Sequence, residues 1–234
     1  MNEAIITPEI RAVFFDAVGT LIEPRPSAAV IYQLAGEAHG IQLDERTIEQ
    51  RFSQAFAAEE DRDYVAGLRA SEGGERDRWR RIVAAVFAGH PSEELFDELW
   101  HWFARPMAWR ATYDAAEVLG EIAHRGLALG IASNFDRRLH SVIDGLPELA
   151  PIQHRVISSE VGWRKPASMF LDAVIREAGC EPGQILFVGD RRDTDYDAAN
   201  AAGLRGVLFD KDHPPNYDVR RIGNLTELLR PTAV

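Results

Sequence analysis

The sequence predicts an α/β protein with a parallel sheet and an inserted, entirely helical segment. Short apolar runs rich in β-formers alternate with helical patterns over residues 10–15 and 106–209. Between these two stretches only helical patterns occur. Because strands that alternate with helices form parallel sheets covered on both faces, we expect the core to comprise residues 1–22 and 109–234. Residues 23–108 are expected to form the insert.

The expected core strands are short and mostly apolar. The first contains Ala12-Val13-Phe14-Phe15 and ends at Asp16, and Gly19-Thr20 then breaks the pattern. Each later strand has a helical pattern close by in sequence. The predicted strands cover residues 10–15, 127–132, 152–157, 184–188 and 206–209, and the predicted core helices cover residues 114–125, 167–178 and the stretches that end at 144 and 202.

Polar side chains mark where the insert helices are expected to begin. Ser27 is expected to cap the first helix, Asp44 the second and Ser92 the fourth. Residues 72–74, with two adjacent glycines, interrupt the helical pattern before the third. Four tryptophans are expected to pack within the insert, namely Trp79, Trp100, Trp102 and Trp109.

Composition limits the classes of partner. The net charge of −11 arises from acids spread along the chain, which argues against a general nucleic-acid binder with a basic face. No apolar run reaches the length of a membrane span, and no signal-peptide pattern opens the sequence. The single cysteine, Cys180, excludes an internal disulfide framework, so a cytoplasmic location is expected. The expected partner is a small anionic substrate rather than nucleic acid or a membrane.

Three polar residues each follow a predicted strand. Asp16 follows the first strand, Ser133 the second and Asp190 the strand that ends near residue 188. Ligands of parallel α/β sheets bind outside the carboxyl ends of the strands. We therefore expect these three segments to form one site, with the helical insert over it.

Four motifs in this order resemble those of the haloacid dehalogenase superfamily. Residues 14–21, Phe-Phe-Asp-Ala-Val-Gly-Thr-Leu, resemble the first motif, in which an apolar strand precedes Asp-x-Asp-x-Thr. Ser133 after its strand is similar to the second motif, and Lys165-Pro166 to the third. Residues 189–195, Gly-Asp-Arg-Arg-Asp-Thr-Asp, resemble the fourth. The resemblance covers essentially the whole chain and implies a Rossmann-like core with a helical cap.

The resemblance implies a role for each anion-binding residue. Asp16 would be the nucleophile, which splits one difficult step into two. Thr20, Ser133 and Asn134 would bind the phosphoryl group, and Lys165 would offset the charge of nucleophile and substrate. Lys165 is also unusual in composition, because residues 1–164 contain no lysine and only Lys211 follows it.

The resemblance also implies a magnesium site. Asp190 would hold Mg²⁺ together with Asp16 and the main-chain oxygen of Val18, a donor set of the oxygen atoms that this hard cation prefers. Asp195 would lie beside Lys165 or the waters of the metal. The same acids also fit a solvated helix start, since acidic side chains are common near helix N-termini.

Val18 is the departure from the family pattern. Phosphatases of the superfamily have an aspartate there, which protonates the leaving oxygen and then activates water, an effect worth about 10²–10⁴-fold. One interpretation is a phosphatase that recruits another acid, Asp136 or an insert carboxylate. A second is a 2-haloacid dehalogenase, in which halide needs no protonation and Arg25 would bind the substrate carboxylate. A third is a binding or regulatory protein on a degenerate hydrolase fold. Phosphonate cleavage needs a cap lysine, which the insert lacks.

Overall fold

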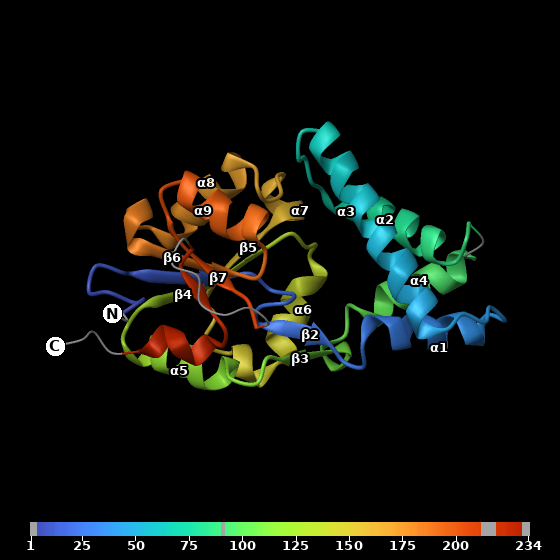
Figure 1. Ribbon diagram of the computed structural model, residues 1–234, viewed down its shortest axis with the longest axis horizontal. Coiled ribbons are helices and arrows are strands. Elements are labelled where there is room, and N and C mark those ends of the chain that lie inside the picture. The colour runs from blue at the N-terminus through green and yellow to red at the C-terminus, as the bar shows by residue number, and fades with distance from the viewer. Residues whose placement is uncertain (1–3, 90–91, 212–218, 231–234) are drawn as a thin grey trace.

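The computed structural model describes residues 4–89, 92–211 and 219–230, in which six strands form one parallel sheet (Figure 1). The strand order is β5-β4-β1-β6-β7-β8, and every neighbouring pair is parallel. The predicted α/β class is therefore confirmed. The strands are β1 (Ala12–Phe15), β4 (Ala128–Ser133), β5 (His154–Ile157), β6 (Ile185–Gly189), β7 (Arg205–Phe209) and β8 (Arg221–Ile222).

Helices cover both faces of this sheet (Figure 1). Helices α5 (Ala115–His124) and α6 (Arg138–Gly145) pack in one apolar cluster. Helices α8 (Ser168–Ala178) and α9 (Ala198–Ala201) pack in a second cluster on the opposite face. The remaining core elements are α7 (Ser158–Val161), the 3₁₀ turns η2 (Pro147–Leu149), η3 (Pro182–Gln184) and η5 (Leu225–Leu229), and the π-helical turn η4 (Arg192–Asp197).

Strand β1 lies in the middle of the sheet, and its sequence explains why. Val13 and Phe15 belong to one apolar cluster, and Ala12 and Phe14 belong to the other. All four side chains are fully buried. Side chains alternate between the two faces of a strand, so a strand covered on both faces needs a continuous apolar run. This run fixes the position of Asp16 at the carboxyl end of the central strand.

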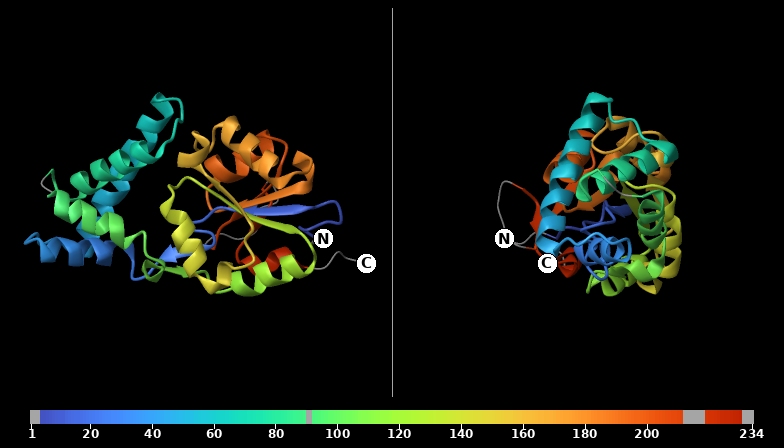
Figure 2. Two further views of the ribbon diagram at one scale, coloured as in Figure 1. Left: turned by 180° about the vertical axis from the view of Figure 1, so that it is seen from behind. Right: turned by 90° about the vertical axis from the view of Figure 1, so that its right-hand side faces the viewer.

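The insert is a group of four helices that stands beside the sheet (Figures 1 and 2). Its own apolar cluster includes Tyr32, Ile48 and Phe96. The side chains of Ser27, Asp44 and Ser92 accept hydrogen bonds from backbone amides of the first turns, which confirms the three predicted caps. The helices are α1 (Ala28–Ala38), α2 (Glu45–Val65), α3 (Glu72–Val86) and α4 (Glu93–Trp102).

The glycine pair at residues 73–74 lies inside the first turn of α3, not between helices as predicted. Ser71 explains the difference, because its side chain accepts a hydrogen bond from the Gly74 amide at 3.1 Å. This cap offsets the low helix propensity of glycine. Trp109 also differs from expectation, since it packs in the apolar cluster of the sheet rather than in that of the insert.

Two short strands connect the insert to the core. β2 (Ile22–Pro24) pairs antiparallel with β3 (Trp109–Ala111), which follows the 3₁₀ turn η1 (Pro106–Ala108). The predicted boundaries of the insert, after residues 22 and 108, fall at this pair. Three-residue strands are too short to show an alternating pattern, so the sequence indicated only a connector here. Among the described residues, no helix has the length and apolar character needed to cross a membrane.

Candidate active site

The carboxyl ends of three adjacent strands bring the predicted polar residues to one edge of the sheet. Strand β1 pairs with β4 on one side and β6 on the other, so that Phe15 lies opposite both Ile131 and Val188. The amide of Asp16 donates to the carbonyl oxygen of Val188 at 2.8 Å. The parallel register therefore places Asp16 beside Asp190, which follows β6.

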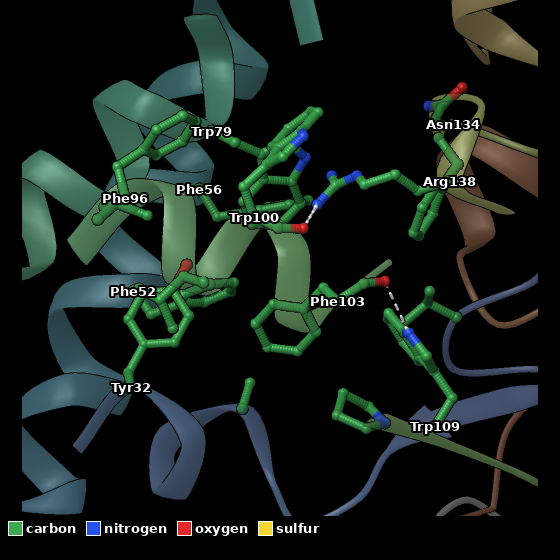
Figure 3. Close-up of a pocket in the computed structure, with 16 residues that line it drawn as sticks. Tyr32, Phe52, Phe56, Trp79, Phe96, Trp100, Phe103, Trp109, Asn134 and Arg138 are labelled. Atoms are coloured by element: carbon green, nitrogen blue, oxygen red, sulfur yellow. Dashed lines mark hydrogen bonds between the residues drawn. The ribbon is translucent and has the colours of Figure 1, made fainter. Parts of the chain in front are cut away.

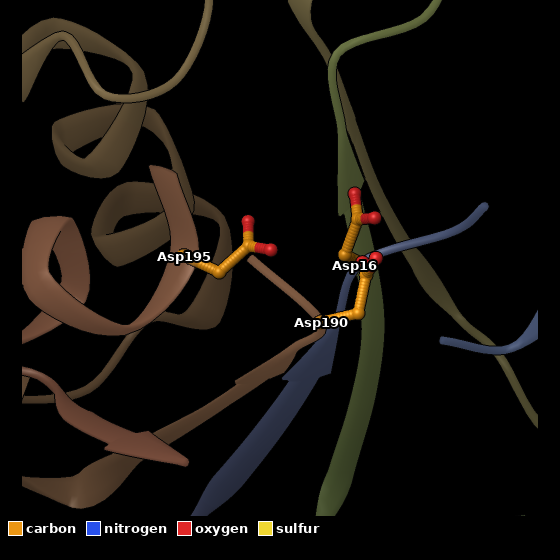
Figure 4. Close-up of side chains that lie close together, drawn as sticks. All are labelled: Asp16, Asp190 and Asp195. Carbon is orange, nitrogen blue, oxygen red and sulfur yellow. The ribbon is translucent and has the colours of Figure 1, made fainter. Parts of the chain in front are cut away.

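Three carboxylates gather at this edge (Figure 4). One oxygen from each of Asp16, Asp190 and Asp195 lies within 4.8 Å of the other two. Burial, followed by the charges of Asp16 and Asp195, raises the pKa of the partly open Asp190 to about 6. Burial is also the largest influence that raises the pKa of Asp195, which is only 1% exposed. Such a cluster requires a compensating cation.

Lys165 supplies that cation from the loop before α8. Its buried Nζ donates to one oxygen of Asp16 and to one oxygen of Asp195, each at 2.6 Å. Burial alone would lower the pKa of Lys165, but the two carboxylates outweigh it and raise the pKa well above its ordinary value. Lys165 is thus a fixed positive charge in the site, and it contacts only one of the two Asp16 oxygens.

The side chain of Asn134 holds the lysine loop in place. Its Nδ2 donates to the carbonyl oxygen of Lys165 at 3.0 Å, and its Oδ1 accepts from the Lys165 amide at 2.7 Å. These paired bonds join the end of β4 to the loop that carries the cation. Ser133, the last residue of β4, is buried at the same edge.

Glycines allow the carboxylates to come this close to the backbone. Gly19 has a φ of +93°, and a Cβ there would lie 2.5 Å from Oδ2 of Asp190. A Cβ at Gly189 would collide with the carboxyl group of Asp195. The hydroxyl of Thr20 donates to Oδ1 of Asp190 at 3.3 Å. The turn after β1 is therefore shaped around Asp190, and only glycine fits at position 19.

The oxygen atoms at this edge fit a divalent cation. Three backbone amides, those of residues 20–22, donate to the carbonyl oxygen of Ala17. In contrast, no backbone amide of the described residues donates to the carbonyl oxygen of Val18. The Val18 oxygen is therefore available to join the carboxylate oxygens of Asp16 and Asp190, hard donors of the kind that Mg²⁺ prefers.

A cavity of about 310 Å³ lies between this edge and the insert (Figure 3). It adjoins the site at Val18 and Asn134, and the described side chains around it are almost all apolar or aromatic. The lining residues are Val18, Pro24, Ala28, Tyr32, Phe52, Phe56, Trp79, Val83, Phe96, Leu99, Trp100, Phe103, Trp109, Asn134, Phe135 and Arg138.

Ion pairs attach the insert to the core close to Lys165. Arg164, the neighbour of the lysine, forms a partly buried ion pair with Asp63 and a buried one with Glu75, both in the insert. Arg191, which follows Asp190, bonds Glu60 of α2 at 2.5 Å. The two loops that carry site residues therefore also contact the insert.

Comparisons with known proteins identify the family. Residues 10–203 match the family model described as haloacid dehalogenase-like hydrolase. The chain belongs to this family.

Among its relatives is "haloacid dehalogenase-like hydrolase domain-containing protein 3" of Mus musculus, which is 31% identical over 91% of this chain and 86% of its own. A phosphoglycolate phosphatase of Rhodospirillum rubrum is 27% identical over 85% of this chain and 79% of its own. The fold is similar to that of an L-2-haloacid dehalogenase from Xanthobacter autotrophicus, with a TM-score of 0.73, 18% identity, and coverage of 94% and 96% of the two chains.

In this haloacid dehalogenase-like hydrolase, the structure brings Asp16, Lys165, Asp190 and Asp195 together. It also places the Ser133–Asn134 pair at the same edge of the sheet. Two residues that were predicted to bind the substrate, Arg25 and Thr20, have other surroundings in the structure. Arg25 is exposed and is not among the described residues that line the cavity. Thr20 is fully buried, and its hydroxyl contacts Asp190.

Asp136 does not have the position expected of a replacement acid. It is fully buried, and both of its oxygens accept hydrogen bonds from the guanidinium of Arg138, at 2.8 and 2.7 Å. Arg138 in turn lies 3.4 Å from the ring centre of Trp100 in the insert. The sequence did not indicate roles for Arg138 and Arg164. Arginines are numerous in this chain, and no local pattern shows which of them form ion pairs inside the folded protein.

The titration of Asp190 predicts the metal-free stability of the Asp190→Asn variant. The folded-state pKa of about 6 exceeds the unfolded value of 3.8, so the ionised carboxylate destabilises the folded protein increasingly as pH rises through that window. At pH 7 in a chelator, removing this charge should raise Tm by about 2–4 °C, which corresponds to about 1 kcal/mol after allowance for solvent screening.

The same variant tests the metal site. At pH 4 the gain in metal-free Tm should disappear, and Mg²⁺ should raise the Tm of the unmodified protein but not of the variant. Differential scanning fluorimetry measures both effects. An equal Mg²⁺ response in both proteins would place the metal outside this cluster.

Proposed function

We propose that this hydrolase is a Mg²⁺-dependent phosphatase that acts on a small phosphorylated compound and uses Asp16 as its nucleophile. The observation that carries the proposal is the buried lysine bridging Asp16 and Asp195 beside Asp190. A cation held between a nucleophilic carboxylate and further acids serves a reaction in which an anionic group must approach that carboxylate.

The residues support a two-step reaction. One Asp16 oxygen forms a bond to phosphorus, the bond from phosphorus to the ester oxygen breaks, and its electron pair leaves with that oxygen. Water then cleaves the aspartyl phosphate and regenerates Asp16. Lys165 offsets the charge of nucleophile and phosphoryl group. The Ser133 hydroxyl and the backbone amide of Asn134 bind a phosphoryl oxygen. Asp16, Asp190 and the Val18 carbonyl would hold Mg²⁺, which would supply Lewis-acid polarisation of the phosphoryl group when bound.

The helical insert, residues 23–108, is proposed as a cap that encloses the organic part of the substrate. Its contacts to Arg164 and Arg191 support this role, because they tie the insert to the loops that carry Lys165 and Asp190. Exclusion of water at that boundary would strengthen the electrostatic interactions of the site.

A second candidate function is 2-haloacid dehalogenation. The residue that favours it is Val18, because a departing halide needs no proton, and the apolar cavity beside it suits the alkyl part of such a substrate. The acidic cluster favours the phosphatase, because three adjacent carboxylates suit a divalent cation, and displacement of a halide from carbon requires none.

A substrate screen separates these functions. Phosphate esters and 2-haloacids are incubated with and without Mg²⁺, and released phosphate and halide are measured, with Asp16→Asn as the control. We expect Mg²⁺-dependent phosphate release that the control lacks. Metal-independent halide release would instead establish the dehalogenase. Tight ligand binding without either product would establish the non-catalytic alternative.

A further inference from the structure

We propose that the substrate is an aryl phosphate ester, whose apolar ring occupies the cavity beside Val18 and whose oxygen leaves as a stable aryl oxide. This inference rests on the proposed phosphatase function and names its substrate class. Two independent features carry it, the walls of the cavity and the residue at its junction with the site.

The walls favour an apolar ring. At about 310 Å³ the cavity is at the lower end of the range for small-molecule sites, roughly 300–1,000 Å³. Nine of its lining residues are aromatic, and they come from all four insert helices as well as from β3 and the end of β4 (Figure 3). Aromatic walls bind a ring through offset and edge-to-face contacts in addition to the burial of apolar surface.

The cavity offers few partners to a polar group. Among the described residues that line the cavity, only Arg138 is charged. Its guanidinium donates two hydrogen bonds to Asp136, which neutralises the charge. The Arg138 guanidinium also donates to the carbonyl oxygen of Trp100 at 3.1 Å and lies against its ring. A sugar or a second anionic group placed here would lose most of its hydrogen bonds to water, because the polar atoms of Tyr32, Trp79 and Asn134 are few against the apolar lining.

Val18 favours a leaving group that needs no proton. Val18 is 37% exposed and lines the cavity two residues beyond Asp16. With phosphorus at Asp16 and the ring in the cavity, the ester oxygen lies at this junction. None of the described lining residues carries a carboxylate. An alkoxide is too basic to leave without an acid, whereas an aryl oxide, whose phenol has a pKa of about 10 as in tyrosine, leaves far more readily.

Atoms and charges balance in this reaction. The Asp16 oxygen forms the new bond to phosphorus, and the bond from phosphorus to the aryl oxygen breaks with its electron pair on the oxygen. The aryl oxide then takes a proton from solvent after release. Water then attacks the phosphorus of the aspartyl phosphate, and the bond from phosphorus to the Asp16 oxygen breaks with its electron pair on Asp16. The protons of the water remain on the released phosphate or pass to solvent.

Three phosphate compounds test the effect of the apolar ring and the effect of the leaving group separately. 1-Naphthyl phosphate has an apolar ring and a good leaving group, 2-(1-naphthyl)ethyl phosphate has the ring but a poor leaving group, and acetyl phosphate has a good leaving group without a ring. With Mg²⁺, kcat/KM for 1-naphthyl phosphate should exceed that for each of the others at least about tenfold.

A matched pair of variants on α1 tests where the ring binds. Ala28 lines the cavity, whereas Leu34 on the same helix is 58% exposed. Ala28→Phe should lower the ratio of kcat/KM for 1-naphthyl phosphate to that for acetyl phosphate at least about tenfold, and Leu34→Phe should retain it. Without turnover, 1-naphthol should quench the fluorescence of Trp79 and Trp100, and this quenching should be lost in Ala28→Phe.

The outcomes distinguish this inference from the function beneath it. If acetyl phosphate or the naphthylethyl ester is hydrolysed as well as 1-naphthyl phosphate, the aryl proposal is wrong and the phosphatase function stands. If Ala28→Phe retains both the preference and the quenching, the ring does not bind in this cavity. If none of the three compounds releases phosphate beyond the Asp16→Asn control, the phosphatase function fails, and this inference fails with it.

Discussion

Lys165→Met is expected to lower phosphate-ester hydrolysis by about 10²–10³-fold, the range for removing one preorganised stabilising group. In the unmodified protein Nζ of Lys165 contacts Asp16 and Asp195 at 2.6 Å each. Without it, the anionic substrate must approach an uncompensated carboxylate cluster. Steady-state kinetics with 1-naphthyl phosphate measures the loss, and Lys211→Met, which changes the only other lysine, is the matched control.

The same variant should also unfold more easily at pH 7. Removing one partner of a buried ion pair costs about 3–5 kcal/mol, because the remaining charge stays buried. Loss of the ammonium raises the pKa of Asp195 further above its unfolded value, so this cost should shrink as pH falls toward 4 and grow as pH rises. Lys165→Arg keeps the charge and should recover more stability than Lys165→Met. Unchanged hydrolysis in a folded Lys165→Met protein would show that the lysine has no part in the reaction.

Val18→Asp is expected to raise kcat/KM for an alkyl phosphate ester by more than tenfold, within the range of about 10²–10⁴ for general acid catalysis. The new carboxyl group would lie at the junction of cavity and site, where it can protonate the leaving oxygen. Because Val18 is 37% exposed, the variant need not bury a charge completely. The gain should be much smaller for 1-naphthyl phosphate, whose leaving group needs little protonation.

The control for this experiment is Val18→Asn, which has nearly the same shape but no acidic proton. Circular dichroism and the Mg²⁺-induced rise in Tm should first establish that both variants fold and bind metal. If a folded, metal-binding Val18→Asp protein gains nothing on any ester, the missing acid is not what limits this enzyme. Dehalogenation or a non-catalytic role would then be the better explanation.

Local sequence was enough to predict much of the core. The run Ala12-Val13-Phe14-Phe15 is apolar on both faces, which only a covered central strand requires, and it positions Asp16. Parallel strands then bring Ser133 and Asp190 to the same edge, because their carboxyl ends point in one direction. The helix caps at Ser27, Asp44 and Ser92 were also predictable, because each cap depends only on a few neighbouring residues.

Tertiary structure alone decided which polar side chains pair with each other. Arg138 neutralises Asp136, Thr20 contacts Asp190, and Arg25 stays at the surface. The strands β2 and β3 and the aromatic cavity also join residues that are far apart in sequence. Sequence determined the elements because propensity and apolar periodicity act between near neighbours. Pairings across the fold depend on distances and burial that exist only after the insert and the sheet have packed.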